Sequence, residues 1–402
     1  MINKSFFSKV FPELNKAIDA VIYIYMGFVF VVSMNLNPEI KKYSNAFALV
    51  VIALIGIYVL TKDFKGILNR FTVIFGIYTA YCLLTILWSA DRAITIERST
   101  TVLKIFIVCA LIYYYVVNEK KTDMFLHAIY LGGISLLVFT IVYYGPKEYV
   151  VGMIAGKRMG YDFADANDLG RALMYTSIIG LYYTFYEKRW WNIFISALSA
   201  FVSVGTGSRI AIIIFIVGLF CLFFFYFTGK KRILGIGAFI ILAGIGFALL
   251  YLPAFENMRI RILGMLGELT GKSNADISTS YRIMMAHAGI NQFLKTPIFG
   301  LGIGTSNVIL SKAIGVESYL HNNFIEMLAC GGVIGFIVFY ALHGTILLKN
   351  IKPAYKRNTK SVLSITLILM ILAQGIASVD YYEKITLIMI TYMFCSLNDF
   401  EN

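Results

Sequence analysis

The stretch VESYLHNNFIEMLACGGVIGFIVFY, Val316 to Tyr340, begins with polar residues and then becomes almost entirely apolar. A helix needs roughly 20 apolar residues to cross a bilayer, and the chain supplies them from about residue 321 to 348. His321, Asn322 and Asn323 therefore stand where a polar segment enters a membrane helix. The whole chain has 4 histidines, so a histidine beside two amides at this boundary is a candidate for a chemical role.

Composition places the whole chain among polytopic membrane proteins. Of its 402 residues, 59% are hydrophobic and 14% are charged, and the mean hydropathy is +0.77, which does not suit a soluble domain with a polar surface. Nothing in it alternates like a barrel strand. We predict an all-α polytopic membrane protein with about twelve transmembrane helices, at about residues 17–34, 45–60, 71–88, 99–117, 124–144, 170–186, 190–204, 210–228, 233–252, 321–348, 361–379 and 382–397.

The distribution of Lys and Arg predicts the orientation of these helices. Positive charge is retained on the cytoplasmic side, and with an inner N-terminus the basic residues concentrate in the inner segments, as at residues 120–121 and 230–232. Both termini are therefore expected in the cytoplasm. The net charge of +13 comes largely from these basic residues on the cytoplasmic side, where they contact anionic lipid head groups. We therefore expect a lipid bilayer as partner and no nucleic acid.

The chain is expected to form a single integral membrane domain, residues 1–402, with two large outer loops at 145–169 and 253–320. The second loop contains STSYRIMMAHAGINQFLKTPIFG, which predicts an amphipathic helix from about residue 280 to 294, a proline stop and a glycine-rich turn. Outer loops with this much local structure usually carry function. The five cysteines have no ligand spacing, so neither disulfides nor a zinc site is expected.

Three residues on the outer side are candidates for chemistry. Arg209 follows a Gly/Ser-rich turn at the outer end of an apolar helix, where a guanidinium either snorkels to water or meets an anion. Arg282 opens the loop helix, and an arginine near a helix N-terminus suits a phosphate, although a solvated surface arginine fits the pattern as well. Histidine in general has an unperturbed pKa near neutrality and suits a general base, so His321 is a candidate for that role, with helix capping as the alternative. Asn322 or Asn323 is expected to orient its ring or to bind sugar hydroxyls.

Three motifs in order resemble the successive signatures of the O-antigen ligase and polymerase superfamily, the Wzy C-type family. They are a serine-arginine pair at a helix start, an arginine that opens a loop helix ending in a Pro-x-x-Gly-x-Gly turn, and a His-Asn pair before a Gly-x-x-Gly. Two further stretches agree more loosely, LWSAD at 87–91 and GYDFADANDLG at 160–170. The motifs lie in GTGSRIAI (205–212), YRIMMAHAGINQFLKTPIFGLGIGTSN (281–307) and HNNFIEMLACGGVIG (321–335).

The resemblance implies a glycosyltransferase C-like fold and an enzyme that works at the outer face of a bacterial inner membrane. Such enzymes take a glycan from a polyprenyl (undecaprenyl) pyrophosphate donor and move it to a hydroxyl of a glycan acceptor. By position, Arg209 and Arg282 are assigned to the pyrophosphate and His321 to the base or to orientation of the acceptor. Asn167, Lys157 and Arg158 of the first outer loop are further candidates for substrate binding.

The reaction differs between members of this family only in the acceptor. A ligase uses lipid A core and a polymerase uses another lipid-linked repeat unit. The short link from the glycine turn to His321, residues 302–320, leaves little surface for a bulky core oligosaccharide and favours a polymerase of O-antigen or capsule repeats. The partners expected for a polymerase include a flippase and a chain-length regulator.

Two alternatives use different chemistry. A metal-dependent transferase would use the outer-loop cluster of Asp162, Asp165, Asn167 and Asp168, but their irregular spacing lacks a metal-loop pattern, so we expect no metal cofactor. A twelve-helix secondary transporter would have ionisable groups at mid-membrane. Here Lys104 is the one basic residue in the interior of a predicted span, and the polar groups gather outside, which favours an enzyme.

Overall fold

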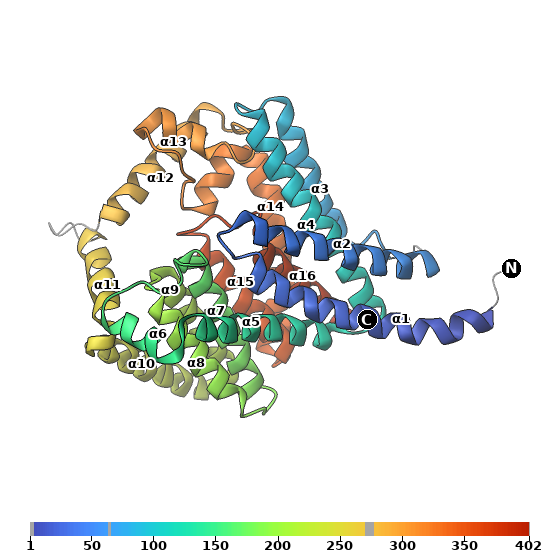
Figure 1. Ribbon diagram of the computed structural model, residues 1–402, viewed down its shortest axis with the longest axis horizontal. Coiled ribbons are helices and arrows are strands. Elements are labelled where there is room, and N and C mark those ends of the chain that lie inside the picture. Colours follow the sequence, from blue (N-terminus) through green and yellow to red (C-terminus); the bar gives the residue numbers. More distant parts are fainter. Residues whose placement is uncertain (1–3, 63–65, 270–276, 402) are drawn as a thin grey trace.

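The computed structural model describes residues 4–62, 66–269 and 277–401, and helices dominate this part of the chain (Figure 1). The described residues contain no β-strand, and an isolated bridge joins Asn35 to Ala164. The α-helices are α1 Lys4–Gly27, α2 Pro38–Thr61, α3 Arg70–Leu84, α4 Arg92–Asn118, α5 Thr122–Tyr144, α6 Pro146–Ile154, α7 Ala166–Phe185, α8 Asn192–Gly205, α9 Arg209–Tyr226, α10 Arg232–Leu249, α11 Glu256–Leu269, α12 Ile277–Lys295, α13 Ser306–Ile314, α14 Asn323–Tyr355, α15 Thr359–Gln374 and α16 Lys384–Glu401.

The predicted class, an all-α polytopic membrane protein, is confirmed. Each predicted span coincides with one helix, namely α1 to α5, α7 to α10 and α14 to α16. Within the described residues, 8 of these are long and apolar enough to cross a membrane, while α8 and α15 are apolar but shorter. The figure of twelve spans, like the placement of both termini in the cytoplasm, stays a prediction.

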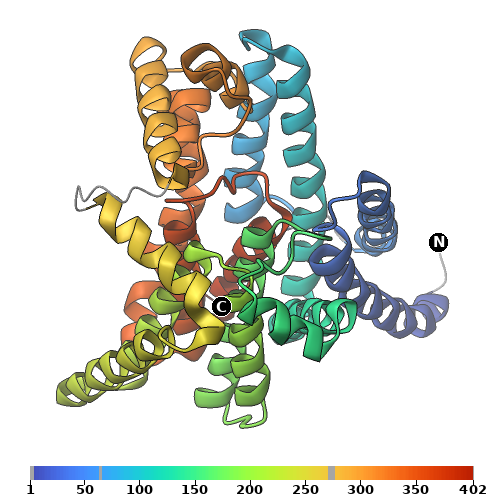
Figure 2. The ribbon, with the colours of Figure 1, turned by 60° about the vertical axis from the view of Figure 1, so that its left-hand side comes forward.

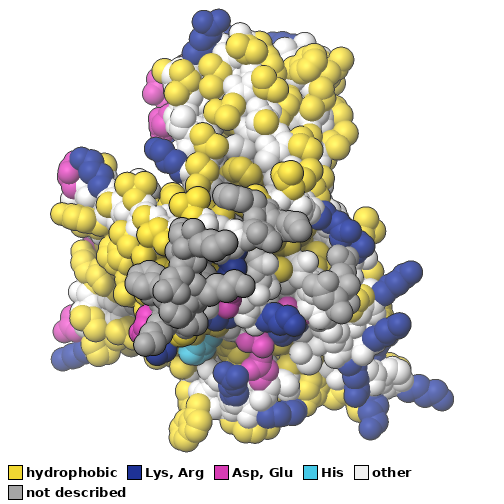
Figure 3. Space-filling view, turned by 90° about the vertical axis from the view of Figure 1, so that its right-hand side faces the viewer, with side chains coloured by type: hydrophobic (Ala, Val, Ile, Leu, Met, Phe, Trp, Pro, Cys, Tyr) yellow, Lys and Arg dark blue, Asp and Glu magenta, His cyan; other side chains and the backbone are white. Residues whose placement is uncertain are grey.

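Hydrophobic side chains fill the interior of the bundle and also cover much of its surface. Large aromatic residues such as Tyr78, Phe75 and Phe339 are fully buried, whereas Leu49 and Leu60 on α2 are 66% and 74% exposed. Figure 3 shows one face on which hydrophobic side chains dominate the upper part and Lys and Arg gather at the lower right. This surface suits a protein surrounded by lipid. The five cysteines are all free and buried.

Local sequence signals fix where several helices begin. The side-chain oxygens of Asn37, Asn69, Asp91 and Asn322 accept hydrogen bonds from backbone N–H groups in the first turns of α2, α3, α4 and α14. Such caps satisfy donors that have no partner within the helix.

In the packed bundle, α7 lies against α8 and α9, α15 lies between α9 and α14, and α3 lies beside α4 and α14. Figure 2 shows α3, α4 and α14 side by side, with α12 and α13 near their upper ends.

The outer loops contain more helix than the sequence predicted. The loop helix expected at about residues 280–294 is confirmed as α12, and the same loop also holds α11 and α13. The first outer loop, residues 145–169, contains α6 and the start of α7.

Helix α14 is kinked at Gly332. The glycine turn, residues 300–304, follows α12 and packs against α14 at the kink. Gly332 has φ 63° and ψ −172°, which interrupts the helical hydrogen bonding. The backbone N–H groups of Leu301 and Gly302 donate to the carbonyls of Ala329 and Cys330 at 3.0 and 2.9 Å. A Cβ on Gly300, where φ is 70°, would meet the Cys330 backbone at 2.4 Å. Glycine is therefore required where the two backbones meet.

Candidate active site

His321 lies in a short segment that is anchored on both sides. The N–H of Leu320 donates to Glu326 Oε2 at 2.9 Å, and Glu326 is buried at 1% exposure. On the other side, Asn322 Oδ1 accepts from Ile325 N–H at 3.0 Å and caps α14. Between these anchors His321 has φ 52°, a left-handed conformation that histidine adopts more readily than most residues. Asn322, and not His321, caps the helix.

Asn323 joins the start of α14 to the segment between α15 and α16. Its backbone N–H donates to the Gly375 carbonyl at 2.7 Å. Its Oδ1 accepts from the N–H groups of Asp380 and Tyr381 at 3.0 and 3.2 Å. The side chain is 1% exposed, so we assign Asn323 to holding this segment and not to direct contact with a sugar. Asn322 Nδ2 donates to the neighbouring carbonyl of Ile376 at 3.2 Å and supports the same segment.

The imidazole of His321 is held in its neutral form. Its ring lies 4.0 Å from the Tyr319 ring, measured between centroids. The pKa of His321 is lowered to about 4, mainly by burial and also by the positive charges of Arg282 and Arg171, while Asp165 opposes them. At neutral pH one ring nitrogen therefore has a free lone pair, as a general base requires.

Arg209 and Arg282 lie on neighbouring elements. Arg209 begins α9 after the capping residue Ser208 and is 6% exposed. Its Nη1 donates to Thr279 Oγ1 at 3.2 Å and to the Arg261 carbonyl at 3.4 Å. Thr279 lies about one turn before Arg282 on α12. Arg209 thus contacts the helix that carries Arg282, and Arg282 is close enough to His321 to lower its pKa.

Two candidates from the first outer loop bind each other. Arg158 Nη2 donates to Asn167 Oδ1 at 3.2 Å, and Arg158 Nε donates to the carbonyl of Thr206 at 3.0 Å. The Arg158 side chain also packs on Gly207, where φ is 65°. Arg158 therefore holds this loop against the turn that precedes Arg209. Lys157 is exposed next to it, and its backbone N–H donates to the Gly152 carbonyl at 2.9 Å.

The acidic residues of the same loop have separate structural partners. Asp162 Oδ2 accepts from the Tyr144 hydroxyl at 2.7 Å, and Asp165 Oδ1 caps α7 by accepting from the N–H of Asn167 at 2.8 Å. Asp168 forms an ion pair with Arg171. Within residues 4–62, 66–269 and 277–401, no group of three or more His, Cys, Asp or Glu side chains could hold a metal ion.

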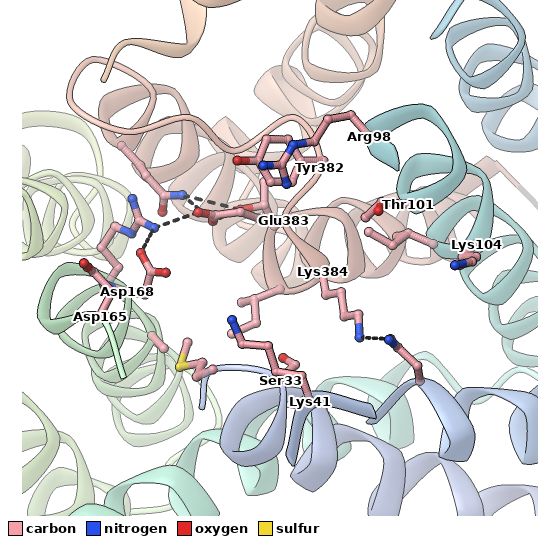
Figure 4. A pocket seen from close by; sticks show the side chains of 18 of the residues that line it. Ser33, Lys41, Arg98, Thr101, Lys104, Asp165, Asp168, Tyr382, Glu383 and Lys384 are labelled. Atoms are coloured by element: carbon pink, nitrogen blue, oxygen red, sulfur yellow. Dashed lines mark hydrogen bonds and ion pairs between the residues drawn. The ribbon is translucent and has the colours of Figure 1, made fainter. Parts of the chain in front are cut away.

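A polar cavity of about 480 Å³ lies beside these residues and was not predicted from the sequence (Figure 4). Five helices, α2, α4, α7, α15 and α16, and the loop at 33–36 line it. Each contributes residues from the half on the side predicted to be outer, and the lining on α4 reaches as deep as Lys104 and Ile105. One wall is the buried Arg171, which pairs with Asp168 and with Glu383 Oε1 at 2.8 Å. The charged lining residues are Lys41, Glu97, Arg98, Lys104, Asp165, Asp168, Arg171, Glu383 and Lys384.

The sequence contained two signals for this cavity. Asp168 and Arg171 are spaced for an ion pair on one helix turn, and Arg171 lies at the start of the predicted span 170–186, where a charge needs a partner. Lys104 is a second charge within a predicted span. Neither signal reveals that α2, α4, α7 and α16 meet at one place, because that depends on tertiary packing.

Comparison with known protein families gives a match for part of the chain. Residues 194–340, from α8 to the middle of α14, are similar to a family model described as O-antigen ligase. The matched segment includes Arg209, Arg282 and His321, and it excludes Lys157, Arg158 and Asn167. The search of curated proteins finds no match.

Proposed function

We propose that the chain is a membrane polysaccharide polymerase, and the similarity of residues 194–340 to a family model described as O-antigen ligase supports this proposal. The enzyme transfers a glycan from a polyprenyl pyrophosphate donor, such as undecaprenyl pyrophosphate, to the terminal hydroxyl of another lipid-linked repeat unit. The observation that carries the proposal is the neutral His321, which stands beside Arg282 where the outer loop enters α14.

The proposed reaction needs a base and a site for the leaving group. The acceptor hydroxyl oxygen forms a bond to the anomeric carbon of the donor sugar, while the bond from that carbon to the phosphate oxygen breaks. The hydroxyl proton moves to the free ring nitrogen of His321, and polyprenyl diphosphate leaves with the electron pair. A base in this position contributes about 10²–10⁴-fold to the rate.

The diphosphate is assigned to Arg282 and Arg209. A guanidinium presents several N–H donors in one plane and binds two phosphate oxygens at once. Charge builds on the diphosphate as it leaves, so cations fixed before the reaction stabilise the transition state. In the structure Arg209 donates to Thr279 Oγ1, so it also positions the helix from which Arg282 reaches the donor.

Two features support a polymerase over the alternatives. Only the nineteen residues 302–320 separate the glycine turn from His321, and this leaves little surface for the lipid A core that a ligase would accept. The O-antigen ligase match and the outer-side cluster favour an enzyme over a transporter. We place the protein in a bacterial inner membrane with both termini cytoplasmic and the site outside, where a flippase delivers substrate and a chain-length regulator acts on the product.

The decisive test is transfer by the purified protein from a lipid-pyrophosphate donor. His321→Ala should lose about 10²–10⁴-fold in rate and still bind the donor through its arginines, whereas His321→Gln should keep part of the ring's orientation without the base. His287→Ala is the matched control, because His287 is an exposed histidine on α12 of the same outer loop.

Each part of the proposal has an outcome that would overturn it. Full activity of His321→Ala would reduce His321 to a structural residue of the junction. The wild type should remain active in EDTA. Loss of that activity would move the chemistry to the acidic loop at residues 162–168.

A further inference from the structure

The charges in the polar cavity are arranged in two groups. On the wall nearest His321, the positive charge of Arg171 is balanced by Asp168 and Glu383. On the other side lie Lys41, Lys104 and Lys384, drawn in Figure 4 around the lower and right parts of the cavity. With Asp165, the first group has three carboxylates and one guanidinium, and Glu97 and Arg98 pair with each other. The cavity therefore has an acidic end and a positively charged end.

The lysines of the charged end form no close ion pair with a carboxylate among the residues that the structure describes, although Lys41 is near enough for its charge to act on Asp168. Lys384 Nζ donates to Asn45 Oδ1 at 2.8 Å and to Ser44 Oγ at 3.3 Å, and both acceptors are neutral. No ion pair joins Lys41 or Lys104 to a carboxylate within the described ranges. By contrast, the adjacent Lys42 points to the surface, where it pairs with Glu39 at 2.6 Å.

The depth of Lys104 favours an anion that belongs to a lipid. It lies twelve residues after the start of α4 at Arg92, which is about 18 Å along the helix. An ionisable side chain within an apolar span is costly and usually marks the path of a polar ligand. On the neighbouring α2, Leu49, Ile57 and Leu60 are exposed, so a prenyl chain could lie in the bilayer beside an anionic head group held in the cavity.

The size and position of the cavity fit a head group that carries a glycan. Its volume of about 480 Å³ falls within the range of roughly 300–1,000 Å³ that is usual for ligand pockets. Asp165 and Arg171, which line the acidic end, are two of the residues whose charges act on His321. A glycan anchored at the lysines can therefore extend along this wall towards the base.

We infer that the cavity binds the diphosphate of the second lipid-linked glycan, the acceptor, through Lys41, Lys104 and Lys384. The donor diphosphate occupies Arg209 and Arg282 on the other side of the Arg171 wall, and the two glycans meet at His321. This inference rests on the proposed function and sharpens it, because a polymerase binds two polyprenyl diphosphates at once and a ligase binds one.

The test counts polyprenyl diphosphate molecules bound to the protein. Wild type in phosphatidylcholine nanodiscs is titrated with radiolabelled undecaprenyl diphosphate and should bind two equivalents. The combined variant Lys41→Gln, Lys104→Gln and Lys384→Gln should bind one, and so should Arg209→Ala with Arg282→Ala. Lys42→Gln is the control and should bind two. Equal elution volumes on gel filtration exclude misfolding, and Lys104→Gln alone should weaken the lysine site about tenfold or more.

The outcomes separate this inference from the proposed function. Two outcomes would overturn the lysine site and leave the donor assignment intact. In one, the triple lysine variant still binds two equivalents of undecaprenyl diphosphate. In the other, wild type binds a single equivalent, and the arginine variant no longer binds it. Two equivalents in the arginine variant would overturn the donor assignment. If inorganic pyrophosphate at equal concentration displaced the lipid from the lysine site, the inference that the site binds a lipid-linked diphosphate would be overturned. In turnover assays the triple variant should raise KM for the acceptor about tenfold or more and leave KM for the donor unchanged.

Discussion

The environment of His321 predicts an unusual dependence of activity on pH. At pH 6 a histidine with the ordinary pKa of about 6.5 is about 24% neutral. Burial lowers the pKa of His321 to about 4, which makes it about 99% neutral at the same pH, since the ratio of neutral to protonated form is ten to the power of pH minus pKa. The ratio kcat/KM reports the free enzyme. It should therefore stay near its plateau at pH 6 and reach half of it only at about pH 4.

The bound donor should move this limit in a predictable direction. A diphosphate on Arg282 places negative charge near His321 and offsets the positive charge that lowers its pKa. Opposite charges favour the protonated ring, so the pKa in the complex is higher than in the free enzyme. Since kcat reports the complex, the acid limb of kcat should lie at a higher pH than the acid limb of kcat/KM.

Initial rates of polymer formation in nanodiscs between pH 4 and 8 test both expectations. The residual activity of His321→Gln, lower by about 10²–10⁴-fold, should show no acid limb from this group. Gel filtration at each pH checks that the protein stays folded. A half-maximal kcat/KM near pH 6.5 in wild type that disappears in His321→Gln would show an exposed ring with an ordinary pKa. The same acid limb in both proteins would assign the titration to another residue.

Three further predictions concern the donor site, the glycine turn and the orientation. Arg282→Lys and Arg209→Lys should each raise the barrier to transfer by about 2–4 kcal/mol, because an ammonium does not reproduce a planar fork. Normal kcat/KM in both variants at normal protein levels would refute the diphosphate assignment. Gly300→Ala should destabilise the protein by about 2–4 kcal/mol in a thermal unfolding assay, since its Cβ would lie 2.4 Å from backbone and φ is 70°. The control Gly344→Ala, with nothing within 4 Å of its Cβ, should unfold like wild type. Ser311→Cys on α13 should react with an impermeant thiol reagent added outside intact cells, and labelling only after lysis would reverse the topology.

Much of the fold follows from the sequence because the signals for it are local. Apolar runs of sufficient length predicted the membrane helices, and capping residues such as Asp91 mark where helices start. The loop helix was predicted from its periodicity and from the proline after it. The kink of α14 could not be predicted in the same way. A Gly-Gly pair inside an apolar run is compatible with a straight helix. Gly332 is non-helical because the turn after α12 supplies hydrogen bonds that replace those α14 loses at the kink.

The residues of the candidate site show the same difference between local signals and tertiary contacts. Arg209, Arg282 and His321 became candidates because each stands beside a local signal, a cap, a helix start or a polar-apolar boundary. The roles of Asn323 and Arg158 were not predictable, since the partners that occupy them lie 57 and 48 residues away in sequence. The cavity was missed for the same reason. Its lysines come from three helices. Lys41 and Lys384 each have the pattern of an ordinary charge at a membrane boundary, and Lys104, although it lies within a predicted span, does not indicate which residues surround it.

The geometry also shows how one helix sets the distance between the proposed base and the diphosphate site. At its kink α14 accepts hydrogen bonds from the glycine turn that follows α12, and so fixes the C-terminal end of the helix that carries Arg282. One to two turns nearer its start, Glu326 of the same helix holds the N–H of Leu320 and fixes the residue before His321. The segment from Gly302 to Leu320 is therefore held at both ends by one helix, α14. Catalysis requires reacting groups to be placed before the reaction begins, and here that placement comes from backbone hydrogen bonds in the described part of α14.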